Sequence, residues 1–146
     1  MPVEAPAVPA ERSPLDEALA LVGDRWTLLL VEELLSGPRR FNDLVERMPG
    51  IASNVLSQRL KSLERHGLLV AVPYSRRPVR HSYELTRPGR ELADALRLLA
   101  AWGARASEHV DPPRHRTCGT PLETRWYCPT CVEAVSDKDG SDIRYF

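Results

Sequence analysis

The sequence has few cysteines and no long hydrophobic run, and each shortage excludes a class of protein. Its 146 residues include three cysteines, all of which lie beyond residue 117. An odd number confined to one end argues against a disulfide framework and favours metal binding or free thiols in a reducing compartment. No apolar run approaches the roughly 18 residues that span a bilayer. We therefore expect a chain without a membrane segment.

The first residues also lack the features of a secretory signal. Residues 1–12 contain no basic segment followed by an apolar core, and they are rich in proline and alanine. We expect a disordered tail there, and by default a cytoplasmic protein. Catalytic patterns are missing as well: we find no Ser/His/Asp arrangement, no glycine-rich phosphate loop and no paired carboxylates. The sequence therefore predicts a protein that is not an enzyme.

The formal net charge is zero, but the charge is unevenly distributed. Residues 1–35 carry two bases against seven acids, a net charge of −5. Residues 36–87 carry ten bases against four acids, a net charge of +6, and the remainder has −1. A basic segment within a neutral chain is expected of a module that binds a polyanion, although a solvated basic face gives the same count.

Apolar spacing and capping residues predict five helices and three extended segments before residue 107. The expected helix caps are Ser13, Asp24, Asn42, Ser53 and Thr86. A short extended segment covers residues 39–41. Two strands, residues 68–74 and 81–86, are expected on either side of a polar hairpin tip at residues 75–80. This order predicts an α+β, mainly helical fold: a winged helix-turn-helix.

The fourth helix is the predicted reading head. Leu56, Leu60 and Leu63 form a stripe that must face the core. The opposite side and its flank are polar or basic, and one acid, Glu64, lies on the helix. Such side chains pair with base edges or phosphates in a major groove. The expected DNA-binding residues of this helix are Ser53, Asn54, Ser57, Gln58, Lys61 and Arg65.

Arginines outside this helix extend the predicted surface. Arg76, Arg77 and Arg80 lie at the hairpin tip, where they can enter a minor groove or contact phosphates. Arg39 and Arg40, just before the third helix, are further candidate phosphate contacts.

Several stretches together resemble the HxlR-type helix-turn-helix regulators, which are relatives of the MarR-like winged helices. The stretches that carry the resemblance are LVGDRWTLLL (21–30), GPRRFNDL (37–44), PGIASNVLSQRL (49–60), LERHGLL (63–69) and YELT (83–86). They occur in order and span about ninety residues with the spacing of the family. The resemblance implies a homodimer, joined through its N-terminal and last long helices, that binds a pseudo-palindromic operator in double-stranded DNA.

One position departs from the pattern of that family. Several members sense oxidants or electrophiles through a cysteine in a Cys-Pro pair before the first helix, whereas this chain has Ser13-Pro14. Because a hydroxyl cannot form the reactive thiolate, we do not expect thiol sensing there. A small-molecule or redox effector that acts elsewhere remains possible.

The C-terminal cysteines have the spacing of a zinc ribbon. His115 and Cys118 form one pair, and Cys128 and Cys131 form a second after nine intervening residues. Four nitrogen and sulfur ligands suit a closed tetrahedral zinc site if the intervening segment makes a hairpin that brings the pairs together. His109 is an alternative to His115, although it lies outside this spacing. Without metal, Cys128 and Cys131 are candidates for a redox-active pair.

These observations predict four segments: a disordered tail (1–12), a winged helix-turn-helix with its dimerisation helices (13–106), a zinc-ribbon-like module (107–135) and a loose tail (136–146). The predicted function is a sequence-specific DNA-binding transcriptional regulator that acts as a repressor. Two alternatives remain open. One is a protein-interaction module of the transcription apparatus, and the other is a redox- or metal-responsive regulator that uses the C-terminal cysteines.

Overall fold

The computed structural model describes residues 12–135, and the helices and strands follow the predicted order. The elements are α1 (Pro14–Val22), α2 (Arg25–Leu35), β1 (Arg39–Arg40), α3 (Phe41–Arg47), α4 (Ser53–Arg65), β2 (Leu69–Arg76), β3 (Val79–Leu85), α5 (Arg87–Arg105), β4 (Trp126–Cys128) and β5 (Glu133–Val135). The tails predicted at 1–12 and 136–146 lie outside the described residues, apart from Arg12. None of the helices in residues 12–135 is long and apolar enough to cross a membrane.

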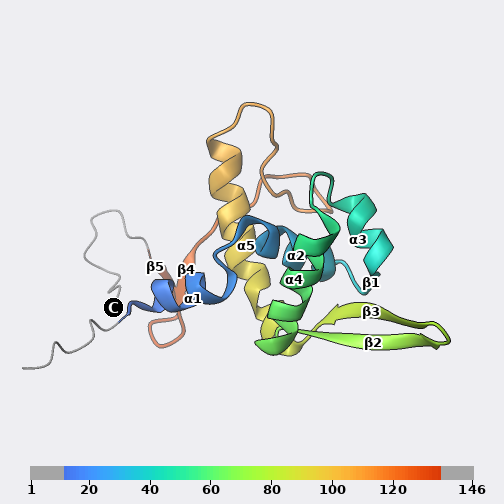
Figure 1. Ribbon diagram of the computed structural model, residues 1–146. Coiled ribbons are helices and arrows are strands. Elements are labelled where there is room, and N and C mark those ends of the chain that lie inside the picture. The colour runs from blue at the N-terminus through green and yellow to red at the C-terminus, as the bar shows by residue number, and fades with distance from the viewer. Residues whose placement is uncertain (1–11, 136–146) are drawn as a thin grey trace, which may run out of the picture.

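The β2–β3 hairpin projects to one side of the helices, and α1 lies on the opposite side (Figure 1). Helix α5 stands behind α2 and α4, and α3 lies above the hairpin (Figure 1). This arrangement is a winged helix-turn-helix, as the sequence predicted, with the hairpin as the wing.

Three of the predicted helix caps are confirmed. The Ser13 hydroxyl accepts a hydrogen bond from the Asp16 N–H at 3.1 Å, and the Asp24 carboxylate accepts one from the Thr27 N–H at 3.1 Å. The Thr86 hydroxyl accepts a hydrogen bond from the Gly89 N–H at 3.3 Å. Each of these bonds satisfies a backbone donor that has no partner within its helix.

The other two predicted caps are wrong by one residue or more. Helix α3 begins at Phe41, one residue before Asn42, because the Asp43 carboxylate accepts a hydrogen bond from the Arg40 N–H at 3.0 Å and fixes the start there. Ser53 is already the first helical residue of α4. Ala52 precedes it in an extended conformation, and its carbonyl accepts from the Leu56 N–H at 2.9 Å.

The three strands β1, β3 and β2 form an antiparallel sheet in that order. Leu69 pairs with Leu85 at the base of the wing, and Arg76 pairs with Val79 near its tip. The predicted loop at 75–80 is therefore wrong, because pairing leaves only Arg77 and Pro78 in the turn. Both faces of the outer wing are exposed, so its strands lack the apolar alternation on which the prediction relied.

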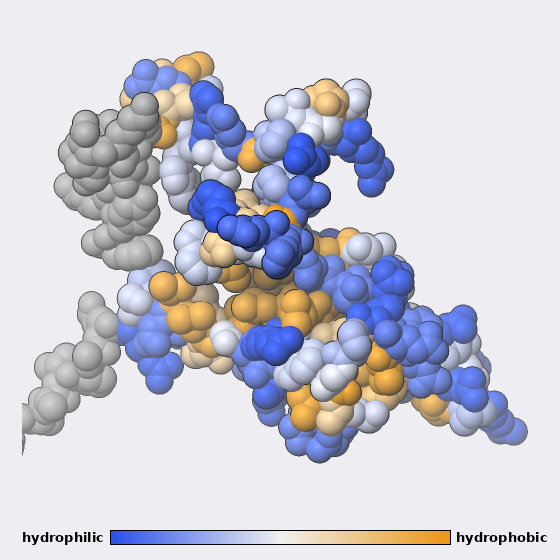
Figure 2. Space-filling model, turned by 90° about the horizontal axis from the view of Figure 1, so that it is seen from above, coloured by the Kyte–Doolittle hydropathy of each residue, from blue (hydrophilic) through white to orange (hydrophobic). Residues whose placement is uncertain are grey.

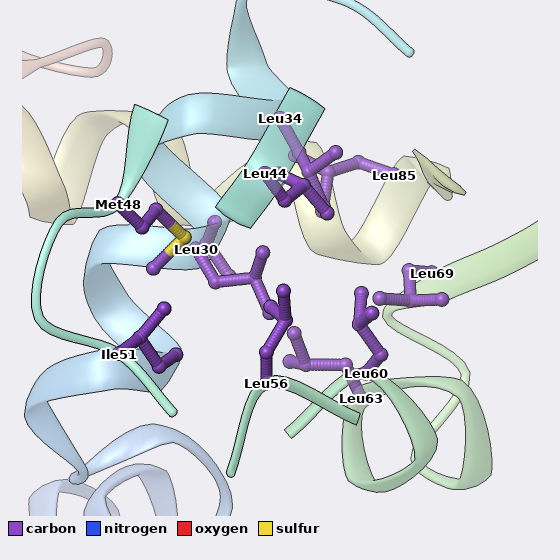
Figure 3. Close-up of a cluster of buried hydrophobic side chains, with 11 residues drawn as sticks. Leu30, Leu34, Leu44, Met48, Ile51, Leu56, Leu60, Leu63, Leu69 and Leu85 are labelled. Atoms are coloured by element: carbon purple, nitrogen blue, oxygen red, sulfur yellow. The ribbon is translucent and has the colours of Figure 1, made fainter. Parts of the chain in front are cut away.

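One apolar core holds the helices and the base of the wing together (Figure 3). The predicted stripe of α4 is confirmed, since Leu56, Leu60 and Leu63 are all at most 2% exposed. The remaining buried members of the cluster are Leu30, Val31, Leu34, Leu44, Met48, Ile51, Leu69 and Leu85. They come from α2, α3, the α3–α4 turn and the base of the wing, so this core fixes α4 relative to the wing.

Candidate DNA-binding surface and cysteine tail

Helix α4 presents its polar side to solvent, directly opposite its buried leucines. Ser53, Asn54, Gln58, Lys61 and Arg65 are exposed, and Ser57 on the flank is half-buried. The tight turn before the helix has Gly50 at a φ of +90°, a conformation that glycine adopts without steric cost. This turn and the helix after it form the second half of a helix-turn-helix, in which the exposed helix face enters the major groove.

Sequence reasoning missed the role of Arg59, which lies on the flank of α4. Its Nη2 donates a hydrogen bond to Asp24 Oδ2 at 3.1 Å, and its Nε lies 2.9 Å from Asp24 Oδ1. Asp24 also caps α2, so one carboxylate joins the start of α2 to the middle of α4. Arg59 therefore positions the reading helix and is distinct from the predicted contacts. The capping role of Asp24 was visible in the sequence, but a partner 35 residues away was not.

The wing carries Arg76, Arg77 and Arg80, all exposed as predicted. Arg40 joins them from β1, because its guanidinium carbon lies 4.5 Å from the centre of the Tyr74 ring on β2. A concavity of about 480 Å³ lies between the wing and the start of α3. Its lining residues are Arg40, Phe41, Asn42, Asp43, Tyr74, Val79, Arg80, His81 and Tyr83. Cationic and hydrogen-bonding groups thus share one hollow at the edge of the sheet.

Tyr74, Asn42 and His81 in this hollow were not predicted as site residues. The hollow forms only because β3 pairs with β1 on one side and β2 on the other, and no local pattern marks that pairing. Burial raises the pKa of Tyr83, which also lines the hollow.

The structure separates the two arginines of β1. Successive side chains of a strand point to opposite faces, so Arg39 points away from the wing hollow that Arg40 lines. Arg39 instead lines a smaller depression with Asp43, Glu46 and Arg47. Of the two predicted phosphate contacts, Arg40 is the one that the fold joins to the wing.

The cationic groups of this surface have no acidic partner among the described residues. Within residues 12–135, no ion pair shorter than 4 Å involves Arg40, Lys61, Arg65, Arg76, Arg77 or Arg80. Other arginines are neutralised: Glu33 accepts a hydrogen bond from Arg47 at 2.7 Å and raises the pKa of that guanidinium, and Glu84 pairs with Arg90. The unpaired positive charge therefore lies along the wing and α4, where DNA phosphates can neutralise it.

The C-terminal tail forms two small hairpins, each with one predicted ligand pair at its tip. In the first, His115 pairs with Thr120, and Leu122 donates to the Pro113 carbonyl at 2.8 Å. The second is β4–β5, with Cys128 opposite Glu133. His109 precedes both hairpins. The segment between the ligand pairs therefore does not form the single connecting hairpin that the spacing predicted.

Hydrogen bonds favour the thiolate form at both tips. The Thr120 hydroxyl and N–H, together with His115, lower the pKa of Cys118 to about 7. The backbone N–H and thiol of Cys131, with the Thr130 N–H, lower the pKa of Cys128. Thiolates are the form of cysteine that binds metals and reacts with oxidants.

The four predicted ligands are not gathered at one point of the chain. No group of three or more His, Cys, Asp or Glu side chains in residues 12–135 is arranged to hold a metal ion. Each hairpin supplies two ligands, which is half of what a structural zinc site needs. Within one chain, the arrangement therefore does not fit a zinc ribbon, and zinc stays a prediction.

The fold and this surface agree with comparisons to known proteins. Residues 21–111 match the family described as HxlR-like helix-turn-helix. The chain belongs to this family. Its relatives are named HTH-type transcriptional regulators, and the chain is accordingly a DNA-binding transcriptional regulator.

Individual relatives extend the similarity beyond the family match. An uncharacterized HTH-type transcriptional regulator of Mycobacterium tuberculosis is 40% identical over 133 residues, covering 88% of this chain and 84% of that protein. A match of this coverage reaches into the tail after residue 111. The HTH-type transcriptional regulator YodB of Bacillus subtilis is 32% identical over 97 residues, with coverage of 66% and 87%.

Solved structures show the same fold. PA1374 of Pseudomonas aeruginosa, proposed to be a transcription factor, has a TM-score of 0.64 and 33% identity over 84% of this chain and 85% of its own. The redox regulator HypR in its reduced form has a TM-score of 0.62 and 28% identity, covering 66% of this chain and 95% of its own. The HxlR-type resemblance and the winged helix-turn-helix fold are therefore confirmed.

Proposed function

We propose that this HxlR-family protein reads an operator through the exposed face of α4, with the wing and Arg40 holding the adjacent backbone. Asn54 and Gln58 can pair with adenine, Lys61 can reach guanine or phosphate, and Ser57 adapts to either. The observation that carries the proposal is the unpaired positive charge of α4 and the wing, placed around a helix whose other side is locked into the core. Such a surface holds the base-contacting side chains of α4 in a fixed position and attracts the DNA phosphates.

A gel shift with the region upstream of the protein's own gene, at low and raised salt, tests this proposal. We expect a shifted band that an unrelated duplex does not compete away, and that weakens as salt rises because cations are released from the phosphates. If the protein acts through protein partners of the transcription apparatus instead, no specific shift appears at any ionic strength, and the proposal fails.

Exposed apolar side chains on α1 and α5 support a homodimer. Leu15 and Leu19 on α1 are 60% and 52% exposed, and Leu99 and Trp102 on α5 are 51% and 62% exposed. Figure 2, which views the molecule from above, shows hydrophobic surface gathered in the middle of this face and bordered by hydrophilic residues. A groove between α2 and α5, lined in part by Leu28, Leu29, Leu96 and Leu99, continues this surface. An isologous contact between two copies would bury it and relate the two reading helices by a two-fold axis.

Such a dimer acts as a repressor when its operator overlaps a promoter, because it excludes polymerase from the same DNA. In vitro transcription from the upstream promoter tests this role. The transcript should fall as protein is added and recover when an operator duplex is added in excess. An increase in transcript with added protein would make the protein an activator.

A further inference from the structure

The two ligand pairs of the tail are held by the same backbone arrangement. In the first hairpin, the Gly119 N–H donates to the carbonyl of His115 at 2.7 Å. In the second, the Val132 N–H donates to the carbonyl of Cys128 at 2.9 Å. In both, the two ligands are three residues apart, and the residue after the second ligand closes the loop with a positive φ, +72° at Gly119 and +57° at Val132. The tail therefore repeats one metal-binding knuckle geometry twice.

Val132 shows that this geometry is maintained at a cost. A β-branched residue rarely adopts a positive φ, because its side chain crowds the backbone. Val132 is also 71% exposed, so burial of its side chain does not compensate for the strain. Backbone strain of this kind persists where the local conformation serves a site. Here it keeps Cys128 and Cys131 on one side of the hairpin tip.

The first knuckle has the dimensions of half a zinc site. His115 Nδ1 lies 3.2 Å from Cys118 Sγ. Two ligands of a tetrahedral zinc ion, with bonds of about 2.3 Å to sulfur and 2.0 Å to nitrogen, lie about 3.5 Å apart. A small adjustment therefore lets this pair bind one ion, and two further ligands must come from another knuckle.

The second knuckle of the same chain is directed elsewhere. The segment that joins the hairpins lies along α5, where Leu122–Trp126 and the helix residues Asp94, Arg97, Leu98 and Ala101 line one groove. The two hairpins leave this segment on opposite sides of α5, with β4–β5 on the side of α1 (Figure 1). Packing of the connecting segment thus keeps the two halves of the site apart within one protomer.

A two-fold axis reverses this separation. The groove between the connecting segment and α5 is lined by Leu98, which is next in sequence to the exposed Leu99 of the proposed dimer face. When two copies meet there, the two-fold rotation moves each hairpin of one protomer to the other side in its partner. The first knuckle of each chain then lies on the same side of the dimer as the second knuckle of the other.

We infer that the dimer binds two zinc ions, each held by His115 and Cys118 of one protomer and by Cys128 and Cys131 of its partner. This inference rests on the proposed homodimer. Each site is closed, with four ligands, so its zinc is structural and links metal binding to dimer stability. Zinc binding therefore links the two protomers, and with them the two reading helices, through their C-terminal tails.

Complementation between two ligand-deficient variants tests the inference. His115→Ala/Cys118→Ser removes the first knuckle, and Cys128→Ser/Cys131→Ser removes the second. The four residues lie on exposed hairpins outside the core, and circular dichroism verifies that both variants fold. The full-length variants are co-expressed with different affinity tags, and the heterodimer is isolated through both tags. Elemental analysis then gives zinc per dimer, and light scattering gives the mass.

The wild type should be a dimer with about one zinc per chain, and each homodimeric variant should have none. The heterodimer retains one complete set of ligands across its two chains, so it should bind about one zinc per dimer. A heterodimer without zinc, beside a wild type with zinc, would place all four ligands in one chain and overturn the shared site. A zinc-free wild-type dimer would overturn the metal site and leave the DNA-binding proposal intact. A monomeric wild type would instead overturn the proposed dimer.

Discussion

At the scale of single residues, the reading helix depends on two kinds of side chain. Arg59 and Asp24 position α4, whereas Gln58 and Lys61 face outward from it. Substitution should separate these roles, since the first pair affects the free energy of unfolding and the second affects only DNA affinity.

Asp24→Ala should destabilise the protein more than Arg59→Ala. The aspartate caps α2 and pairs with Arg59, and loss of a cap costs about 1 kcal/mol. The ion pair, with both side chains more than a third exposed, contributes about 0.5 kcal/mol after screening by solvent. Urea denaturation measures both changes. The double variant Asp24→Ala/Arg59→Ala should lose the same free energy of unfolding as Asp24→Ala alone. If its loss equals the sum of the two single losses, the two residues do not interact.

Gln58→Ala should lower affinity for the operator while leaving affinity for random DNA nearly unchanged. Lys61→Ala should also reduce the slope of log affinity against log salt, by about one unit if it contacts a phosphate. Fluorescence anisotropy at several salt concentrations measures both effects. Arg97→Ala on α5, where the arginine is paired with Asp94, is the matched control and should change neither. Unchanged operator affinity in both α4 variants would remove that helix face from the interface.

At the scale of elements, α5 packs closely against the base of the wing. Gly89 in the first turn of α5 lies against the Leu68 carbonyl, and an added Cβ would overlap that oxygen. Gly103 lies in the same helix with open space around its Cα. These two glycines therefore make a matched pair.

Gly89→Ala should destabilise the fold by about 2 kcal/mol or more, because backbone must shift to admit the methyl group. Gly103→Ala should be neutral or stabilise by up to about 1 kcal/mol, since alanine is the better helix former. Thermal unfolding compares them. Similar effects of the two substitutions would show that the close packing of α5 on the wing does not matter for stability.

The sequence predicted elements where local chemistry determines them. Ser13, Asp24 and Thr86 cap helices through bonds to residues three positions away, and the α4 leucines follow from helical spacing. The sequence misplaced the caps at Asn42 and Ser53 by one or two residues, and it misread the wing tip as a loop, because pairing between β2 and β3 overrides a polar, turn-like composition there. The Arg40–Tyr74 contact and the Arg59–Asp24 pair also depend on the assembled fold, so the wing hollow could not be predicted.

At the scale of the whole molecule, the account predicts a dimer held by α1 and α5. Leu99→Ser/Trp102→Ser should yield a folded monomer, because both side chains are more than half exposed and contribute little to the core of one chain. Light scattering at several concentrations measures the mass. Val79→Ser, which changes an equally exposed residue of the wing, should remain dimeric. A dimer that persists in the α5 variant would place the interface elsewhere.

The central claim is that this protein reads a two-fold DNA sequence with α4, and selection from a random duplex library tests it most directly. The account predicts that the wild type enriches an inverted repeat whose half-sites have centres about 10 base pairs, or a multiple of one helical turn, apart. It also predicts that Gln58→Ala/Lys61→Ala loses that enrichment while remaining folded. No enriched sequence with the wild type, or the same repeat enriched by the variant, would contradict the claim.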